Sequence, residues 1–556
     1  MATLPTGFNK LLNSRRGRTL QENLTAYLFL FPALLLVFVF GIFPVGFAFF
    51  VSLHQWRRFP GEYLGLSNYV RALDSLAYVL FFWIGVGALI YAAIMLWRMW
   101  QQKGERLQAF SSLIPGILNS AAFLLLINWL AITLPIILDI PQRVRGQERV
   151  PGLFVNEFFA SFQYPEAASA GSNFLLVAII ALVVNVVWVR LAKAEQDKSF
   201  LLWGTIAAFA AAVGALTLQL TLSQINSAIA TAQEAGEALP IWSQIIFISA
   251  GVALIVGAYL LWRRATRQEN SDRKLVVYAL AAALLVVGGY ALAAELPRAL
   301  ANSDPEVLTG FNITLMFALG TVPFQLAIGL GLAYLLFQDI KGKSFFRVVY
   351  FLPYIMPFVA TSIVFNLIFS FRPASPANNV LNLFGIAPQK WLSEPIGIFT
   401  LIFGGNVPPI LTGPSLALLV IMIYTTWTYI GYDAVVFLAG LGNISPELYE
   451  AARIDGATSW TIFRYITLPL LSPTTFFLSL IAVIGTFQAF TQIWIMRNPA
   501  SQRSVDTLGV YIFETVRNPS NPNMGYGSAM AFVLFAVILL LTIFQNRIMG
   551  SKVFYG

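Results

Sequence analysis

Long apolar runs separated by short polar segments dominate the 556-residue chain. A helix rises about 1.5 Å per residue, so about 20 apolar residues cross the roughly 30 Å hydrocarbon core of a bilayer. About twelve runs reach or approach that length; they cover residues 24–53, 76–97, 113–138, 174–189, 200–222, 245–262, 275–294, 311–337, 348–371, 415–438, 470–496 and 526–544. This pattern predicts an all-α, polytopic membrane protein with about 12 transmembrane helices.

One polar stretch between two of these runs, residues 450–469, reads EAARIDGATSWTIFRYITLP. Just before it, Ser445 and Pro446 predict an N-cap and a first helical turn, and the carboxylates of Glu447 and Glu450 favour the positive end of that helix. We expect this first short helix to end near Ile454.

Gly456 follows, and glycine adopts backbone conformations that other residues avoid. We therefore expect a turn there and a second short helix through Trp460, Phe463 and Ile466, with Pro469 marking the start of the next span. A link across a membrane surface needs only a few residues, so two helices suggest a docking element. A solvated interfacial loop is the alternative on physical grounds.

A resemblance decides between these two interpretations. The pattern Glu450-Ala451-Ala452, three residues, Gly456, nine residues, Ile466, one residue, Leu468-Pro469 resembles the EAA motif of permease subunits of binding-protein-dependent ABC importers. The resemblance implies that segment 441–469 is a coupling helix pair seated in a cleft of an ATP-hydrolysing subunit. The residues that it assigns to docking are Glu450, Ala451, Ala452, Asp455 and Gly456.

Two further segments resemble sugar-type, MalF-like permeases: residues 64–69, LGLSNY, and the stretch from residue 312 to Pro357. In that family the two segments are close neighbours, whereas here about 230 residues and six predicted spans separate them. We therefore expect an N-terminal segment with the first span (1–74), an inserted membrane region (75–304) and a permease core (305–556). The insertion is either a lateral scaffold around the pore or a regulatory, partner-binding element.

The distribution of charge predicts the orientation of the chain. With the amino terminus inside, inner segments hold 22 of the 34 Lys and Arg residues, among them the cluster from Arg263 to Lys274. By the positive-inside rule we expect both termini and the EAA loop in the cytoplasm of a bacterial cell, with the chain in the plasma (inner) membrane. The net charge of +9 thus reflects membrane topology, and we expect no nucleic-acid partner.

Groups for catalysis are scarce. The chain has no cysteine and one histidine, His54, which lies at a span boundary and is expected to be a satisfied interfacial residue. No GxxxxGK[ST] motif occurs, so ATP must be hydrolysed by a separate subunit. We expect a transport subunit that is not an enzyme and that has no cofactor or metal of its own.

Asp433 is the one ionisable side chain within the twelve predicted spans. A charge inside a membrane is usually paired or functional. Asp433 therefore either bonds to neighbouring backbone or acts in gating, and the scarcity of other charges makes an ion relay through several carboxylates improbable.

Two spans combine aromatic rings, which stack on sugar CH surfaces, with groups that bond to hydroxyls. In a continuous helix Phe487, Phe490 and Thr491 would share one face and Gln488 and Gln492 an adjacent one. MalF-type subunits place aromatic and amide residues in this region toward sugar, although Gln488 and Ala489 stand where asparagines are expected. Packing between helices is the alternative for both stretches. The candidate substrate residues are Trp427, Tyr429, Tyr432, Phe487, Gln488, Phe490, Thr491 and Gln492.

The resemblance implies a permease of an ATP-driven importer for a sugar or oligosaccharide of the maltose type. Its expected partners are membrane lipid, two ABC ATPase subunits, a second MalG-like permease and an extracytoplasmic solute-binding protein that delivers the sugar. The alternatives are an ion-coupled secondary transporter, an ABC importer of a non-sugar solute and a membrane enzyme. A secondary transporter predicts similar halves and ionisable residues at mid-membrane, and an enzyme predicts clustered acidic residues at an interface.

Overall fold

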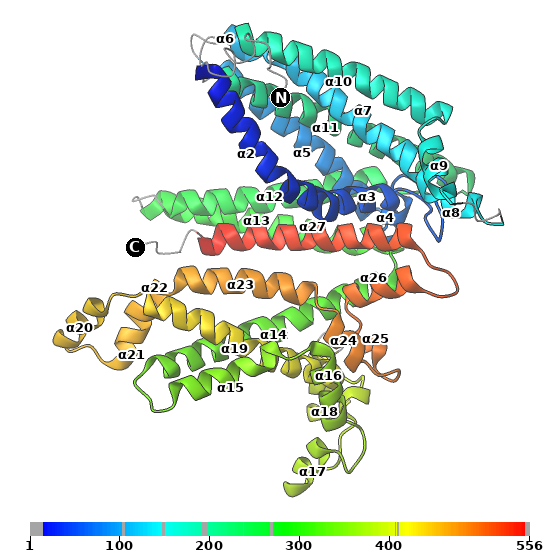
Figure 1. Ribbon diagram of the computed structural model, residues 1–556. Helices are drawn as coiled ribbons and strands as arrows, with labels where there is room; N and C mark the ends of the chain where they lie inside the picture. The colour runs from blue at the N-terminus through cyan, green and yellow to red at the C-terminus, as the bar shows by residue number, and fades with distance from the viewer. Residues whose placement is uncertain are drawn as a thin grey trace, which may run out of the picture. The chain divides into compact units, whose positions relative to one another are not determined.

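The computed structural model describes residues 15–102, 106–146, 151–191, 197–236, 238–266, 271–405, 407–408 and 411–550 (Figure 1). Within these ranges the regular structure is helical, apart from two isolated β-bridges that join His54 to Tyr63 and Gly397 to Ser415. The predicted all-α fold is confirmed.

Ten helices of the described chain are long and apolar enough to cross a membrane, and two further helix pairs qualify if each bent pair counts as one span. The predicted number of about twelve spans is thus reached only when the bent pairs are included. Residues 396–403 contain the six-residue helix α18 (Ile398–Phe403), which is too short to cross a membrane.

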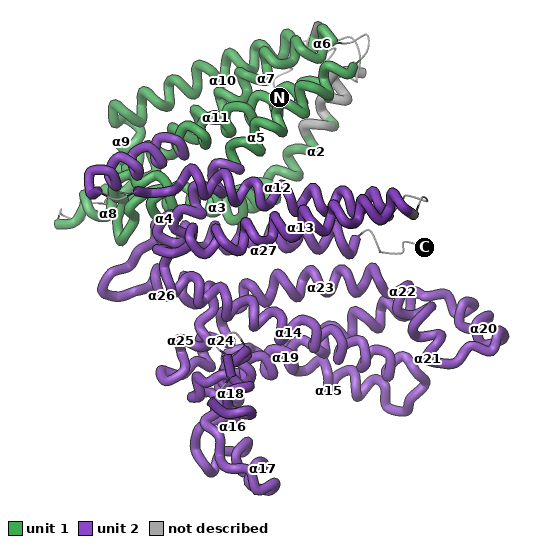
Figure 2. The backbone as a smooth tube through the Cα atoms, turned by 180° about the vertical axis from the view of Figure 1, so that it is seen from behind, with its two compact units in different colours: residues 1–68, 84–220 green, residues 69–83, 221–556 purple. Residues whose placement is uncertain are grey.

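The chain forms two compact units (Figure 2). Unit 1 contains residues 1–68 and 84–220, and unit 2 contains residues 69–83 and 221–556. The unit boundaries fall inside α4 (Ser67–Leu73), α5 (Leu76–Trp100) and α11 (Asp197–Glu234). The division into residues 1–74, 75–304 and 305–556 stays a prediction.

Unit 1 packs its helices through small residues and amides. A Cβ on Gly116 of α7 would meet the backbone of Gly204 on α11, so the two backbones approach closely. Asn119 of α7 and Asn185 of α10 exchange side-chain hydrogen bonds of 3.2 and 2.6 Å. The remaining elements are α2 (Arg15–Val37), η1 (Phe38–Ile42), α3 (Phe43–Ser52), α6 (Arg106–Ser111), α7 (Leu113–Leu138), α8 (Ile140–Arg143), α9 (Leu153–Ser161) and α10 (Pro165–Leu191).

His54 lies just after α3, where its Nδ1 bonds to the carbonyl of Phe50 at 2.8 Å. The ring also packs edge-on against Tyr63, with centroids 5.3 Å apart. The prediction that the ring of His54 has its hydrogen bond satisfied is confirmed.

After the end of α11, unit 2 continues with the helix pair α12 (Ile241–Ala265) and α13 (Ser271–Ala299), whose backbones approach closely at Gly251 and Gly288. The other elements are α14 (Pro305–Phe337), α15 (Lys343–Ile355), α16 (Phe358–Ile368), α17 (Pro376–Leu383), η2 (Trp391–Ser393), α18, α19 (Leu416–Gly442), α20 (Pro446–Ile454), α21 (Ser459–Ile462), η4 (Phe463–Thr467), α22 (Leu468–Leu470), α23 (Ser472–Phe487), α24 (Thr491–Met496), α25 (Gln502–Val505), α26 (Leu508–Arg517) and α27 (Met524–Met549).

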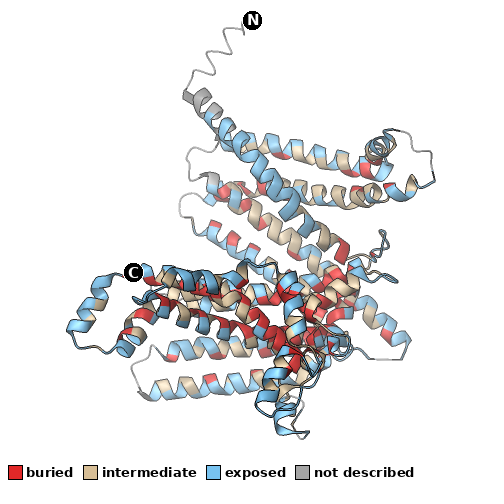
Figure 3. Ribbon diagram, turned by 60° about the horizontal axis from the view of Figure 1, so that its bottom comes forward, coloured by how far each residue is buried: buried red, intermediate tan, exposed pale blue. Residues whose placement is uncertain are grey.

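The core of unit 2 is built on α14 and α19. About half of the most apolar window of each helix is buried, 44% and 50%, whereas no other continuous span exceeds 22% (Figure 3). Gly329 on α14 allows the contact, because a Cβ there would lie 2.7 Å from the Cβ of Asp433 on α19. These two helices therefore form the packed centre, and the other continuous spans are buried to a smaller extent.

Two spans predicted as continuous helices are broken, and both predictions were wrong in this respect. Residues 348–371 form α15 and α16, which meet at a 95° bend where Met356 and Pro357 interrupt the helix. Proline lacks the N–H that a continuing helix needs, which explains the break. Residues 470–496 are interrupted at Leu471, where the bend is 64°, and again at Gln488–Phe490 before α24.

Candidate functional site

The first helix of the EAA loop is α20, Pro446–Ile454, with the bounds that the sequence predicts. Proline occupies its first turn, where a missing N–H costs nothing, and Glu447 lies in the same turn near the positive end of the helix. Ser445 stands at the N-cap position, but its side chain makes no capping hydrogen bond.

Gly456 ends this helix in the left-handed conformation, with φ of +78°. The N–H of Ala457 donates to the carbonyl of Ala452 at 2.9 Å, and the N–H of Gly456 donates to Arg453 at 3.1 Å. These two bonds form a Schellman motif, in which a glycine avoids the steric cost of a Cβ. The predicted turn at Gly456 is confirmed.

The second helix runs through Trp460, Phe463 and Ile466, as predicted. It begins as α21, Ser459–Ile462, capped by the Thr458 side chain, and continues as a π-helical turn, Phe463–Thr467, into α22, Leu468–Leu470. A π turn places one extra residue in the helix and so shifts the face presented by the residues after it.

Aromatic side chains attach the loop to the core helix α14. The ring of Phe463 packs edge-on against Tyr334 with centroids 5.0 Å apart, and Tyr449 lies 6.5 Å from Phe337. The Tyr449 hydroxyl also bonds to the Thr467 hydroxyl at 3.3 Å. Both short helices are therefore in contact with the C-terminal end of α14.

The outer surface of the loop is exposed. Glu450, Ala451, Asp455 and Gly456 are exposed, and Ala452 is half-buried. Large apolar side chains join them: Ile454 is 86% exposed, Trp460 66% and Tyr465 69%. The loop therefore presents charged and large apolar side chains together on one exposed surface.

Trp427, Tyr429 and Tyr432 are half-buried on α19 and belong to a larger aromatic cluster with rings from the bent α15–α16 pair. Tyr432 stacks on Tyr354 with centroids 4.9 Å apart, and Trp427 lies 5.2 Å from Phe365. The structure thus brings this candidate set together.

The second candidate stretch does not form the expected helical face, because α23 ends at Phe487 and α24 begins at Thr491. Phe487 and Gln492 are buried, whereas Gln488 and Thr491 are exposed. Phe490 instead packs on Phe513 of α26, with centroids 4.6 Å apart.

Asp433 is only 2% exposed and faces α14 at Gly329. Among the described residues its carboxylate has no hydrogen-bond partner, and Oδ2 is fully buried. One of the two interpretations of Asp433 required a hydrogen bond to neighbouring backbone. The structure does not show this bond among the residues that it describes. The buried carboxylate remains a candidate for a role in gating.

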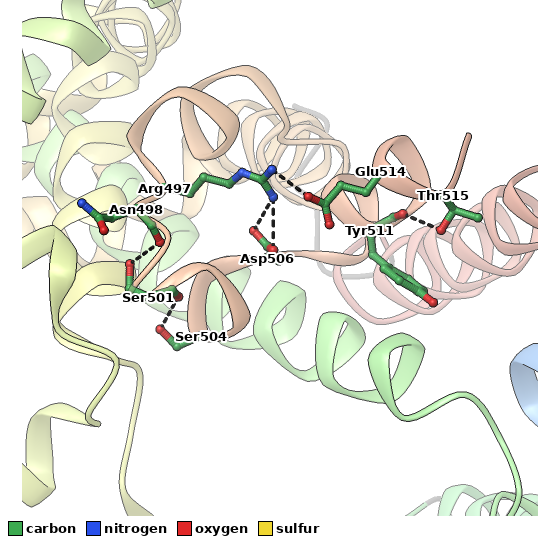
Figure 4. Close-up of polar contacts among 8 residues, drawn as sticks. All are labelled: Arg497, Asn498, Ser501, Ser504, Asp506, Tyr511, Glu514 and Thr515. Carbon is green, nitrogen blue, oxygen red and sulfur yellow. Dashed lines mark hydrogen bonds and ion pairs between the residues drawn. The ribbon is translucent and has the colours of Figure 1, made fainter. Parts of the chain in front are cut away.

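A charged network that the sequence did not reveal lies between α24 and α26 (Figure 4). Arg497 pairs with Asp506 at 3.2 Å and with Glu514 at 2.7 Å, and its guanidinium lies 3.8 Å over the ring of Trp494. Burial raises the pKa of Asp506 to about 6, although the charge and hydrogen bond of Arg497 act in the opposite direction. The sequence around Arg497, Asp506 and Glu514 contains no motif, so the network could not have been identified from local sequence.

Asp304, just before α14, is the second centre of this polar region. Its Oδ2 accepts hydrogen bonds from the hydroxyls of Tyr511 at 2.9 Å and Tyr526 at 2.6 Å. Burial and the Asp304 carboxylate raise the pKa of Tyr511. No group of three or more potential metal ligands occurs in the part of the chain that the structure describes.

The fold and the loop together define a helical, multi-pass membrane protein with an exposed pair of short helices attached to its core. A family model described as "Binding-protein-dependent transport system inner membrane component" matches residues 325–554. This range includes α19, the EAA loop and α27.

Curated relatives agree with the family model. The arabinooligosaccharides transport system permease protein AraP of Bacillus subtilis is 30% identical over 254 residues, which are 45% of this chain and 74% of AraP. The lactose transport system permease protein LacF of Rhizobium radiobacter is 32% identical over 248 residues, 44% of this chain and 76% of LacF. The chain belongs to the family of binding-protein-dependent transport system inner membrane components, the permease subunits of ABC importers.

Among solved structures, a bacterial alginate ABC transporter in complex with an alginate pentasaccharide-bound periplasmic protein contains a similar chain. The two chains are 21% identical, with a TM-score of 0.38, over 44% of this chain and 78% of that chain.

Proposed function

We propose that this chain is a permease subunit of an ATP-driven importer that translocates a sugar or an oligosaccharide. The names of its relatives support the substrate class, since they include permeases for arabinooligosaccharides and lactose and a trehalose/maltose permease of Thermococcus litoralis, which is 26% identical. A maltose-type substrate is the finer form of this proposal.

The exposed EAA loop is the observation that carries the proposal. Its docking residues are Glu450, Ala451, Ala452, Asp455 and Gly456, and the apolar side chains beside them suit a cleft in a partner. The partner is a dimer of ABC ATPase subunits, which hydrolyse the ATP. A second, MalG-like permease and an extracytoplasmic binding protein complete the assembly.

The contacts of the loop suggest how ATPase closure would move the spans. Tyr449 and Phe463 join the loop to α14, and α14 packs along α19 at Gly329. Because packed helices transmit displacement rather than absorb it, a push on α20 would tilt α14 and α19 together. This tilt would change the exposure of the aromatic cluster on α19 from one side of the membrane to the other.

Within the pathway we assign sugar stacking to Trp427, Tyr429 and Tyr432, which are half-buried in the aromatic cluster. The exposed Gln488 and Thr491 are the groups best placed to bond to hydroxyls. Phe487, Phe490 and Gln492 support the break between α23 and α24 by packing.

A second candidate substrate class is a polyol phosphate. The sn-glycerol-3-phosphate permease UgpA of Agrobacterium fabrum is 30% identical over 257 residues, 46% of this chain and 79% of UgpA. The substrate class is therefore tested by comparing the uptake of saccharides with that of sn-glycerol-3-phosphate.

The test uses the complete transporter purified with its own partners and reconstituted in proteoliposomes. ATP-dependent uptake of maltotriose, arabinotriose, lactose and sn-glycerol-3-phosphate is measured with the binding protein outside. We expect at least one saccharide to be taken up, and we expect this uptake to stop when ATP is left out. Uptake of sn-glycerol-3-phosphate alone would assign the second class, and uptake driven by an ion gradient without ATP would refute the importer and favour a secondary transporter.

A further inference from the structure

A pocket of about 820 Å³ lies at the start of α14, at the end opposite to the coupling loop. Three segments of unit 2 line it: Arg71 of α4, residues 302–310 and residues 502–514. The 33 residues of α14 place about 50 Å between this pocket and the loop that contacts its other end. The pocket shares no residue with the aromatic cluster on α19.

The floor of the pocket is held rigid by its own hydrogen bonds. Asp304 accepts from the hydroxyls of Tyr511 and Tyr526 and from the N–H of Glu306 at 3.0 Å. The guanidinium of Arg71 lies 4.1 Å over the Tyr526 ring. A network whose members satisfy one another preorganises the site, so a ligand would not have to order it.

The rim, in contrast, offers unused hydrogen-bonding groups. Asn302, Thr309, Gln502 and Arg503 line the pocket and are exposed. In the described chain none of their side chains forms a hydrogen bond or an ion pair. The two amides, the hydroxyl and the guanidinium supply many donors close together.

The charges of the pocket select the class of ligand. Four carboxylates, those of Asp304, Glu306, Asp506 and Glu514, oppose a free anion. The charges of Arg71 and Arg503 and the ion pairs of Arg497 with Asp506 and Glu514 offset most of that negative charge, so a simple cation gains little. A neutral molecule with many hydroxyls avoids the repulsion that a free anion meets and can still bond to the pocket, because each hydroxyl both donates and accepts. The volume also falls within the range of roughly 300–1,000 Å³ that is usual for small-molecule sites.

We propose that this pocket is a receiving site for a saccharide, separate from the aromatic cluster, which holds the sugar before it passes between the spans. The inference rests on the proposed function for the identity of the ligand and for the orientation of the pocket toward the binding protein. Arg503 and Gln502 bond to the sugar hydroxyls, and Tyr511 offers a ring edge at the floor.

The test measures saccharide binding by saturation-transfer NMR to the complete transporter in nanodiscs, without binding protein. Maltotriose, lactose and arabinotriose serve as probes. The variant is the double substitution Gln502→Ala with Arg503→Ala, which removes no internal hydrogen bond and so leaves the fold intact. The matched control is Arg517→Ala, an exposed arginine of α26 that does not line the pocket.

We expect the double variant to raise the Kd of the bound saccharide at least 10-fold and to raise the external concentration for half-maximal uptake. Arg517→Ala should leave both unchanged. A second variant, Thr309→Ala, should raise the Kd by a smaller factor.

Three results would overturn the inference: an unchanged Kd in the double variant, an equal loss in the control, or no binding to a wild-type transporter that imports the same saccharide. In the last case the proposed function stands without this pocket. A transporter that imports none of the saccharides would instead refute the function on which the inference rests.

Discussion

Asp433 combines features that a purely structural residue would avoid. It is buried on α19 against Gly329, and its carboxylate has no partner in the described part of the chain. Burying a carboxyl without a hydrogen-bond partner is costly, and proteins keep such groups in a membrane mainly where they act.

Asp433→Asn removes the ionisable carboxyl while preserving the shape of the side chain. We expect it to raise the free energy of unfolding by about 1 kcal/mol, because the cost of burying an ionisable group is avoided, and to lower ATP-dependent uptake. Thermal unfolding of the purified chain and uptake by the reconstituted transporter measure the two effects. A loss of stability would show that the carboxylate makes a stabilising bond.

Asp506 makes the stability of unit 2 depend on pH. It lies at the end of unit 2 that is opposite to the EAA loop. Its pKa rises from 3.8 to about 6 because of burial, with Arg497 opposing the shift and Glu514 and Glu306 adding to it. Because the pKa of this carboxyl is raised in the folded protein, the contribution of Asp506 to the free energy of unfolding is fully present below about pH 4. That contribution is lost as the pH rises through about 6.

Asp506→Asn should abolish this dependence. Relative to the variant, the wild type is expected to lose about 1 kcal/mol of stability between pH 4 and pH 7, after allowance for solvent screening. Unfolding temperatures of both proteins across that pH range provide the measurement. Parallel curves for the two proteins would contradict the assignment.

Local features at single residues could be predicted from the sequence. Pro446 and Gly456 act through their own backbone preferences, so the bounds of α20 and the turn after it followed directly. Asp304 could not be identified in this way, because its partners Tyr511 and Tyr526 lie more than 200 positions away.

At the scale of elements, α15 and α19 depend on one close approach. A Cβ at Gly431 would overlap the carbonyl oxygen of Tyr350 on α15. Because that atom belongs to a helix backbone, it cannot move aside without shifting the whole helix.

Gly431→Ala should therefore separate α15 from α19, lower stability by about 2 kcal/mol and reduce uptake. Gly485→Ala is the matched control, since nothing lies within 4 Å of a Cβ there. Thermal unfolding and uptake are compared for both variants. Equal behaviour of the two would show that the α15–α19 contact is not required.

The apolar runs predicted the spans because their length reflects the thickness of the bilayer. The bend at Met356–Pro357 has a sequence signal in Pro357 itself, although the run of apolar residues around it suggested one helix. The break at Gln488–Phe490 has none, because neither proline nor glycine stands there. Packing of Phe490 on Phe513 accompanies this break and depends on a tertiary contact.

At the scale of the whole molecule, the two ends of unit 2 differ in chemistry. One end carries the exposed helices α20 and α21, and the other carries the network of Asp304, Arg497 and Asp506. If the chain is oriented as its Lys and Arg distribution predicts, these ends face the cytoplasm and the exterior respectively.

The absence of cysteine from the sequence allows a direct test of this orientation. Asp455→Cys on the EAA loop and Ser520→Cys after α26 both replace exposed residues. In intact cells stripped of the outer membrane, we expect an impermeant maleimide to label the second variant at least 10-fold more than the first. Preferential labelling of Asp455→Cys would reverse the topology.

The central claim is that the EAA loop binds an ATPase, and an affinity pull-down from native membranes tests it most directly. Tagged wild type is compared with Gly456→Val, which forces a β-branched residue into a left-handed turn at about 1–2 kcal/mol, and with Gly442→Ala, where a Cβ meets no atom within 4 Å. We predict that an ATPase and a second permease co-purify with wild type and Gly442→Ala, and that Gly456→Val loses most of the ATPase but keeps the permease. A wild-type chain that carries no ATPase in mild detergent would contradict the account.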